Sequence, residues 1–386
     1  MKNKFDDRIQ VNSPEFYFAM SCFFFALIKP ILINNASISK VILLVSMSLL
    51  LGLSIASLGF KLIKSNFVLV IIIIGTASLL FMFDYVIRPN PLIGDYFYDY
   101  AVYGVIPLIM LINVKNFKAV LFWWTFWAIV IGLMYIADPF FGYRWIGGYM
   151  PFGFEAMLPA FSGTCIALFH YRKKIVIPLM VVIFIETVVF ANKGAIIACA
   201  GVFIFSYCFL NEEFSTKRII FVIVSGCSLL LIRNNILEFF VNLAKKWGVR
   251  SYSLITISEV LKSSGNGLFD ERTGLWGNVI EYIKQNLILG HGIGYVEWKM
   301  GNYAHNFFLD IVATFGVFLS IFIMLFLLYL LKRIKKIENT EWKYFAYLMF
   351  VLWFFPLQFS LTFWKVSNFW IFIAIPLLKN CYSKEK

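Results

Sequence analysis

Long runs of apolar residues recur along the sequence, separated by short polar segments. Several runs are long enough for a helix to cross about 30 Å of hydrocarbon. The weak alternation of a membrane β-barrel is absent, so the spans are expected to be helices that satisfy their own backbone hydrogen bonds. The predicted spans lie at 16–34, 38–59, 66–83, 98–113, 118–137, 153–170, 175–191, 194–210, 218–232, 305–331, 343–357 and 364–378. The chain is therefore predicted to be an all-α integral membrane protein with about twelve transmembrane helices. The range 98–113 is short and 305–331 is long, so tilt or an interfacial extension is expected in these two.

One large polar segment, 233–304, interrupts this pattern and carries charges of both signs. It divides the chain into a bundle of about nine spans at 1–232, the large loop, and a bundle of about three spans at 305–386. Apolar residues recur at helical spacing inside the loop, as an amphipathic helix requires. They are Trp276, Val279, Ile280, Ile283 and Leu287. This helix is expected to lie on the membrane surface or to cap the bundle.

Composition supports the membrane class. Of 386 residues, 61% are hydrophobic and only 14% are charged, whereas soluble domains carry roughly 25% charged residues. The net charge of +13 comes mostly from lysines and arginines in alternate short loops, which predicts that both termini are cytoplasmic. Contact with anionic lipid heads accounts for these charges, so no nucleic acid partner is predicted. The six cysteines show no paired spacing, which argues against a disulfide framework or a metal site.

With this sidedness, the large loop and the segments 84–97, 138–152 and near 192 are extracytoplasmic. Four basic or titratable residues fall on that side against the inside bias: Arg144, Lys193, Arg272 and His305. Each also has an ordinary interpretation. The arginines and the lysine can reach lipid phosphates or pair on a wet loop, and Asn306 beside His305 is a common helix cap.

Their chemistry suits one class of substrate when they are taken together. Arginine and lysine bind phosphate, and histidine can take a proton from an attacking hydroxyl. A lipid-linked pyrophosphate whose sugar reacts at the membrane surface needs both functions, with fixed positive charge stabilising the departing pyrophosphate. No cluster of carboxylates or cysteines suggests a metal, so neither a metal nor another cofactor is expected.

The segment "RTGLWGNVIEYIKQNLILGHGIGYVEW" followed by "AHNFFLDIVATFGVFLSIF" resembles the O-antigen polymerase and O-antigen ligase superfamily. Upstream, "YRWIGGYMPFG" is similar to an Arg-x-x-Gly loop of that family, and "ANKGAIIA" to its Ser-Arg-Gly turn. The similarity covers roughly residues 140–330. Lys193 stands where the family has arginine, and Leu289 stands where it has proline before the glycine turn. The positions that match the downstream motifs are Arg272, Trp276, Gly290, Gly292, Gly294, His305, Asn306 and Gly316.

The resemblance implies a glycosyltransferase of the bacterial cytoplasmic membrane that needs no nucleotide sugar and no metal. It would pass a growing glycan from undecaprenyl pyrophosphate to a hydroxyl of another lipid-linked repeat unit, making O-antigen or capsule, and a chain-length regulator is a possible partner. The implied roles are pyrophosphate binding by Arg144, Arg272 and Lys193, and catalysis by His305 together with Arg272. Support is expected from Asn306, from the close backbone approach that Gly290, Gly292 and Gly294 allow, and from His291 between them.

Two other functions stay open. A ligase of the same superfamily, which transfers finished glycan to lipid A–core, has overlapping motifs. A flippase or transporter for the lipid-linked unit would need polar residues inside its spans. Lys29, Glu186 and Asp310 are the main residues of that kind.

Overall fold

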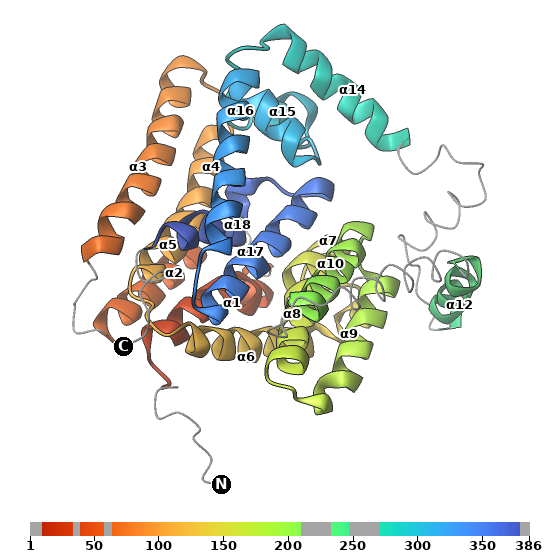
Figure 1. Cartoon of the computed structure of the whole chain (residues 1–386). Helices are drawn as coiled ribbons and strands as arrows, with labels where there is room; N and C mark the ends of the chain where they lie inside the picture. Colours follow the sequence, from red (N-terminus) through yellow and green to blue (C-terminus); the bar gives the residue numbers. More distant parts are fainter. Residues whose placement is uncertain (1–9, 34–38, 58–63, 210–232, 247–269, 379–386) are drawn as a thin grey trace. The chain divides into compact units, whose positions relative to one another are not determined.

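A computed structural model describes residues 10–33, 39–57, 64–209, 233–246 and 270–378. Within these ranges the chain is helical and contains no strand (Figure 1). Six helices are long and apolar enough to cross a membrane. They cover Pro14–Ile33, Ser39–Ala56, Asn66–Ile87, Phe117–Phe141, Tyr149–His170 and Phe307–Lys335. The protein is therefore a multi-pass membrane protein, and the predicted all-α membrane class is confirmed.

The described part of the chain forms two compact units. The first unit comprises residues up to Phe25, Asn35–Trp124 and Leu275 onward; the second comprises Ala26–Asn34 and Thr125–Gly274. The helices α1, α6 and α14 contribute residues to both. The described α-helices of the first unit, with these shared ones, are α1 (Pro14–Ile33), α2 (Ser39–Ala56), α3 (Lys64–Ile87), α4 (Ile93–Tyr100), α5 (Ile106–Leu111), α6 (Phe117–Tyr135), α14 (Asp270–Gln285), α15 (Tyr295–Met300), α16 (Phe307–Lys335), α17 (Thr340–Phe359) and α18 (Ser367–Ala374).

The described α-helices that lie wholly in the second unit are α7 (Tyr149–Pro151), α8 (Leu158–Cys165), α9 (Ile177–Phe190), α10 (Lys193–Phe209) and α12 (Arg233–Lys246). A π-helical segment at Phe152–Met157 joins α7 to α8, and another at Ile166–His170 extends α8, so that residues 149–170 form one continuous apolar helix. The predicted span at 153–170 corresponds to this helix. The predicted span at 218–232 and the basic residues of both chain ends lie outside the described residues.

The predicted short and long spans both depart from a straight helix. Residues 98–113 fall on α4 and α5, which a π-helical segment at Ala101–Val105 joins. Residues 305–331 fall on α16, which is broken at Gly316, where φ is +74° and ψ is 170°. The length of the predicted span 305–331 therefore reflects two helical segments of α16 that meet at Gly316.

Aromatic side chains form much of the core of the first unit. Tyr100 and Trp353 are almost completely buried, and each packs against several other rings. Figure 1 shows α17 and α18 beside α16 in this unit. A smaller apolar cluster of Val279, Ile283, Val296, Ala304 and Ala313 fixes α14 and α15 to the first half of α16. The predicted amphipathic helix exists, and its buried face is narrower than expected because Ile280 and Leu287 are exposed.

A buried ion pair lies inside the second unit. The Nζ atom of Lys29 on α1 is 2.6 Å from Oε2 of Glu155, and the two side chains are 11% and 28% exposed. A charge in a membrane span is costly unless it is paired. Glu155 therefore explains why a lysine is tolerated in the first apolar run.

Candidate functional site

The glycine turn, residues 290–294, crosses the broken region of α16. Gly290, Gly292 and Gly294 have φ values of +70°, +93° and +76°, which only glycine adopts without strain. A Cβ on Gly290 would fall on the backbone of Thr314 and Gly316, and a Cβ on Gly316 would fall on the carbonyl of Ile288. At Gly290 the close approach is to the backbone of α16, and the approach of this turn to a substrate stays a prediction.

Hydrogen bonds are exchanged between the turn and the helix. In an unbroken helix, Ala313 O and Thr314 O would accept from the residues four positions later. Here His291 N donates to Ala313 O at 2.8 Å and Gly292 N donates to Thr314 O at 3.0 Å, while Val317 N donates to Leu287 O at 2.8 Å. Backbone groups at membrane depth must be satisfied inside the protein. The turn supplies those partners, so the break is stable.

Two charged residues at the end of α3 hold the turn from the other side. Asp84, which is 1% exposed, forms an ion pair with Arg88 and accepts a hydrogen bond from Ile293 N at 2.7 Å. The Nη1 atom of Arg88 donates to Leu289 O at 2.7 Å and to Gly290 O at 3.1 Å. Sequence reasoning missed this pair. The signal was a carboxylate and an arginine four residues apart at the end of an apolar span.

His305 and Asn306 stand at the start of α16, as the sequence predicted. The side chain of Asn306 accepts from Phe308 N at 3.0 Å and from Leu309 N at 3.1 Å, so its role as the helix cap is confirmed. His305 has a φ of +51°, a conformation that costs energy for a residue with a Cβ. The cap and the strained residue before it fix the direction from which the imidazole leaves the backbone.

The ring of His305 is oriented by a backbone carbonyl. Its Nδ1 lies 3.1 Å from Phe359 O. A carbonyl oxygen only accepts, so this contact places the proton on Nδ1 and leaves Nε2 as the basic nitrogen of the neutral ring. Tyr303 packs on the imidazole at a ring distance of 4.4 Å and is itself 2.9 Å from the hydroxyl of Ser360. These contacts hold one ring nitrogen and fix the orientation of the imidazole, which is one requirement of a general base.

The first unit also contains two polar contacts made by α4. Tyr96 donates to Oε2 of Glu297 at 2.5 Å, and Lys365 pairs with Asp99 at 3.4 Å. Burial, followed by the nearby carboxylates of Asp310 and Glu297, raises the pKa of the Tyr96 phenol well above its ordinary value. Tyr96 therefore stays a donor to Glu297 and ties α4 to α15.

Arg144 and Lys193 lie in the second unit, at neighbouring backbone segments. The loop that carries Arg144 is held by Asp138, which accepts from Trp145 N at 2.9 Å and Ile146 N at 2.8 Å. Tyr143 donates to Phe190 O at 2.8 Å, which joins this loop to the turn before Lys193. Burial raises the pKa of Tyr143 to about 12, and nearby carboxylates add to the effect, so the phenol keeps its proton.

The two cations differ in their surroundings. Arg144 is exposed, and no group among the described residues pairs with its guanidinium. Lys193 is half-buried at the first position of α10, after Asn192, whose side chain accepts from Ala195 N at 2.9 Å. Arg272 lies in the first turn of α14, and its side chain is outside what the structure describes.

The structure thus brings the predicted site residues together in two groups. His291, His305, Asn306 and the glycine turn lie on the connection between α14 and α16 in the first unit, and Trp276 on α14 donates its Nε1 to Ala304 O at 3.1 Å. Arg144 and Lys193 belong to the second unit.

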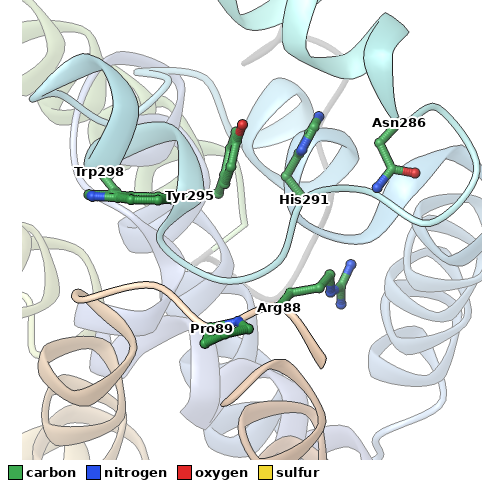
Figure 2. A pocket seen from close by; sticks show the side chains of 6 residues that line it. All are labelled: Arg88, Pro89, Asn286, His291, Tyr295 and Trp298. Carbon is green, nitrogen blue, oxygen red and sulfur yellow. The ribbon is translucent and has the colours of Figure 1, made fainter. Parts of the chain in front are cut away.

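A pocket of about 200 Å³ lies beside the glycine turn (Figure 2). Its lining comes from the end of α3, the segment after α14, the glycine turn and α15, and consists of Arg88, Pro89, Asn286, His291, Tyr295 and Trp298. His291 stacks on Tyr295 at 4.3 Å, and its Nε2 lies 2.7 Å from Tyr282 O. His291 therefore shapes one wall of this pocket.

A second hollow of about 320 Å³ shares Arg88 and Asn286 with this pocket. The rest of its lining is apolar and comes mainly from α3, the segment before the turn, and α16. These residues are Leu80, Phe83, Ile87, Ile288, Leu289, Phe315, Phe318 and Leu319. The small pocket, with its polar and aromatic groups, and the larger apolar groove therefore meet at Arg88 and Asn286.

Among the described residues, no group of three or more histidine, cysteine, aspartate or glutamate side chains is placed to hold a metal ion. The expectation of a metal-independent site stays a prediction.

Comparisons with protein-family models, with curated proteins and with solved structures find no match for this chain.

Proposed function

We propose that this protein is a polymerase of lipid-linked oligosaccharide repeat units of O-antigen or capsule. It transfers the growing glycan from undecaprenyl pyrophosphate to a sugar hydroxyl of another lipid-linked unit. The observation that carries the proposal is a small pocket with polar and aromatic groups that meets a larger apolar groove between α3 and α16. A ligand that joins sugars to a hydrocarbon tail suits such a pair of sites.

The proposed layout has about twelve spans in the bacterial cytoplasmic membrane, with both termini cytoplasmic. The pocket, the glycine turn and His305 then belong to the extracytoplasmic face, where lipid-linked units are assembled into chains. Membrane lipids surround the exposed apolar faces, and a chain-length regulator remains a possible partner.

The proposed chemistry is an exchange of one glycosidic bond for another without a metal. The acceptor hydroxyl oxygen attacks the anomeric carbon of the donor sugar while the bond from that carbon to the pyrophosphate breaks. His305 Nε2 takes the proton of the hydroxyl, and the departing undecaprenyl pyrophosphate keeps the electron pair. Arg272, Arg144 and Lys193 are proposed to stabilise the charge on this leaving group.

A ligase that transfers glycan to lipid A–core would use the same bond exchange, so it remains the nearest alternative. A flippase is the alternative from another class. Lys29 now has Glu155 as its partner, whereas the Oε2 atom of Glu186 on α9 is buried and has no hydrogen-bond partner among the described residues. Glu186 is the feature that keeps a transport function worth testing.

Complementation of a deletion strain tests the proposal, with the surface glycan resolved on a gel. A polymerase predicts single-repeat glycan in the deletion strain, a ladder with the wild-type gene, and loss of the ladder with His305→Ala or Arg272→Ala at equal protein level. Long chains stranded on undecaprenyl pyrophosphate would show a ligase. Lipid-linked units accumulating on the cytoplasmic face would show a flippase.

A further inference from the structure

The pocket in Figure 2 has an aromatic side formed by Tyr295 and Trp298. Trp298 on α15 is 41% exposed although it lines the pocket. Lys299 Nζ lies 3.8 Å from the centre of the Trp298 ring, and the Tyr295 ring packs against Trp298 in a T-shaped arrangement at 5.9 Å. An exposed indole in a pocket lining offers apolar surface to a ligand.

The one charged residue in the pocket lining is compensated. This residue is Arg88, and the carboxylate of Asp84 pairs with its Nη2 atom. The Nη1 atom of Arg88 donates to two backbone carbonyls, and its Nε atom is buried without a hydrogen-bond partner among the described residues. A phosphate binds best to an arginine fork that is free to make two parallel hydrogen bonds. Arg88 presents no such open fork, so the pocket lining favours a neutral ligand over an anion.

Polar groups suited to hydroxyls remain at the rim. The Nδ2 atom of Asn286 donates to Gly290 O at 2.6 Å, and its Oδ1 accepts no hydrogen bond from a described group. The guanidinium of Arg88 is partly exposed, at 19% for the side chain. An amide oxygen, an ion-paired guanidinium and an aromatic face are the groups that bind a sugar ring, because a pyranose has an apolar C–H face and a polar edge.

The size of the pocket limits the ligand. Sites for drug-sized molecules enclose about 300–1,000 Å³, whereas this pocket encloses about 200 Å³. One ring fits, and an oligosaccharide must extend out of it.

We infer that the pocket lined by Trp298, Asn286 and Arg88 is a subsite for one neutral pyranose of the lipid-linked glycan, stacked on the indole. This inference rests on the proposed function for the identity of the glycan. The contacts on α15 and the glycine turn define the subsite by themselves, so its binding test is independent of chain extension.

The test uses the full-length protein in lipid nanodiscs and saturation-transfer NMR. The probes are the methyl glycosides of glucose, galactose, rhamnose and N-acetylglucosamine, with inorganic pyrophosphate as a competitor. We expect saturation of the ring protons of at least one glycoside, an affinity about tenfold lower in Trp298→Ala, a smaller loss in Trp298→Phe, and no displacement by pyrophosphate. Tyr85→Ala is the control, because Tyr85 is an exposed aromatic residue on α3 outside the pocket lining.

The inference is overturned if no glycoside is saturated, if Trp298→Ala binds as the wild type does, or if pyrophosphate displaces the sugar. Chain extension separates this result from the proposed function. If His305→Ala abolishes the ladder and no glycoside binds, the subsite alone is wrong. If the ladder survives His305→Ala while glycosides bind through Trp298, the proposed reaction is wrong and the subsite stands.

Discussion

The backbone of Gly290 lies directly against the backbone of Gly316, and neither residue has room for a Cβ. The two glycines are the point where the connection between α14 and α16 and the broken helix share their hydrogen bonds. A substitution at this contact therefore tests whether the folded protein requires the break in α16.

Gly316→Ala is expected to destabilise the protein by more than about 2 kcal/mol. The new methyl group meets backbone atoms, and the residue keeps a positive φ that alanine disfavours. The measurement is thermal unfolding of the purified protein in detergent. Gly75→Ala in α3 is the matched control, because open space surrounds Gly75 and alanine favours a helix. Equal stability of the two variants would contradict the tight contact.

Asp84→Asn is expected to cost about 2–4 kcal/mol, because it removes the compensating charge of a partly buried arginine. In Asp84→Ala, which removes the acceptor as well, hydrogen exchange at the amide of Ile293 should speed up, since that amide donates to Asp84. Glu281→Gln is the control. Its ion pair with Lys284 is 65% exposed on both sides and is expected to change stability by no more than about 0.5 kcal/mol. Unchanged exchange at Ile293 would show that Asp84 does not hold the turn.

Variants of Asn306 are expected to change stability, whereas a variant of His305 is expected to change activity. Asn306→Ala removes the cap of α16 and should cost about 1 kcal/mol, and Asn306→Ser should restore most of it. His305→Ala should abolish the glycan ladder while the protein level is kept. Unfolding midpoints and gels of the same variants provide the two measurements. An Asn306→Ser variant that is stable and inactive would show that the carboxamide does more than cap the helix.

Arg144→Ala is expected to leave the unfolding midpoint unchanged, because this exposed guanidinium has no partner among the described residues. Chain extension should fall about tenfold or more if Arg144 binds pyrophosphate. Lys173→Ala, an exposed cation of the same unit on the predicted cytoplasmic side, should leave both properties unchanged. An equal loss of activity in both variants would point to a general effect of surface charge.

Glu155→Gln is expected to cost about 3 kcal/mol, because it removes the carboxylate that pairs with the buried charge of Lys29. Adding Lys29→Met should recover much of that loss. The four unfolding midpoints of the double-mutant cycle give the coupling energy. Additive effects would mean that the two side chains do not stabilise each other.

The sequence predicted the helical membrane class and the cap at Asn306 because both depend on local pattern. Apolar length defines a span, and an asparagine followed by an apolar helix is a recognisable start. The amphipathic helix after residue 270 was found by the same periodicity, although its buried face proved narrower. The positive φ of His305 has no local signal, because tertiary contacts impose it.

Contacts between distant segments could not be predicted. Asp84 and Ile293 are 209 residues apart, and a single sequence carries no information on their pairing. The break at Gly316 was likewise hidden, because a single glycine in an apolar run is compatible with a continuous helix. The pocket lined by Trp298 and Arg88 depends on both of these long-range arrangements, so it was missed as well.

The break in α16 also has a consequence for biosynthesis. The ribosome makes the chain in order, so α3 with Asp84 and Arg88 emerges first, the glycine turn next and residues 313–317 last. The final segment enters the bilayer when the groups that complete its hydrogen bonds already exist on the preceding chain. The earlier segments therefore supply the hydrogen-bond partners that stabilise the break in α16. In a chain that stops before α16, the backbone groups of the glycine turn have been made but lack their partners on α16.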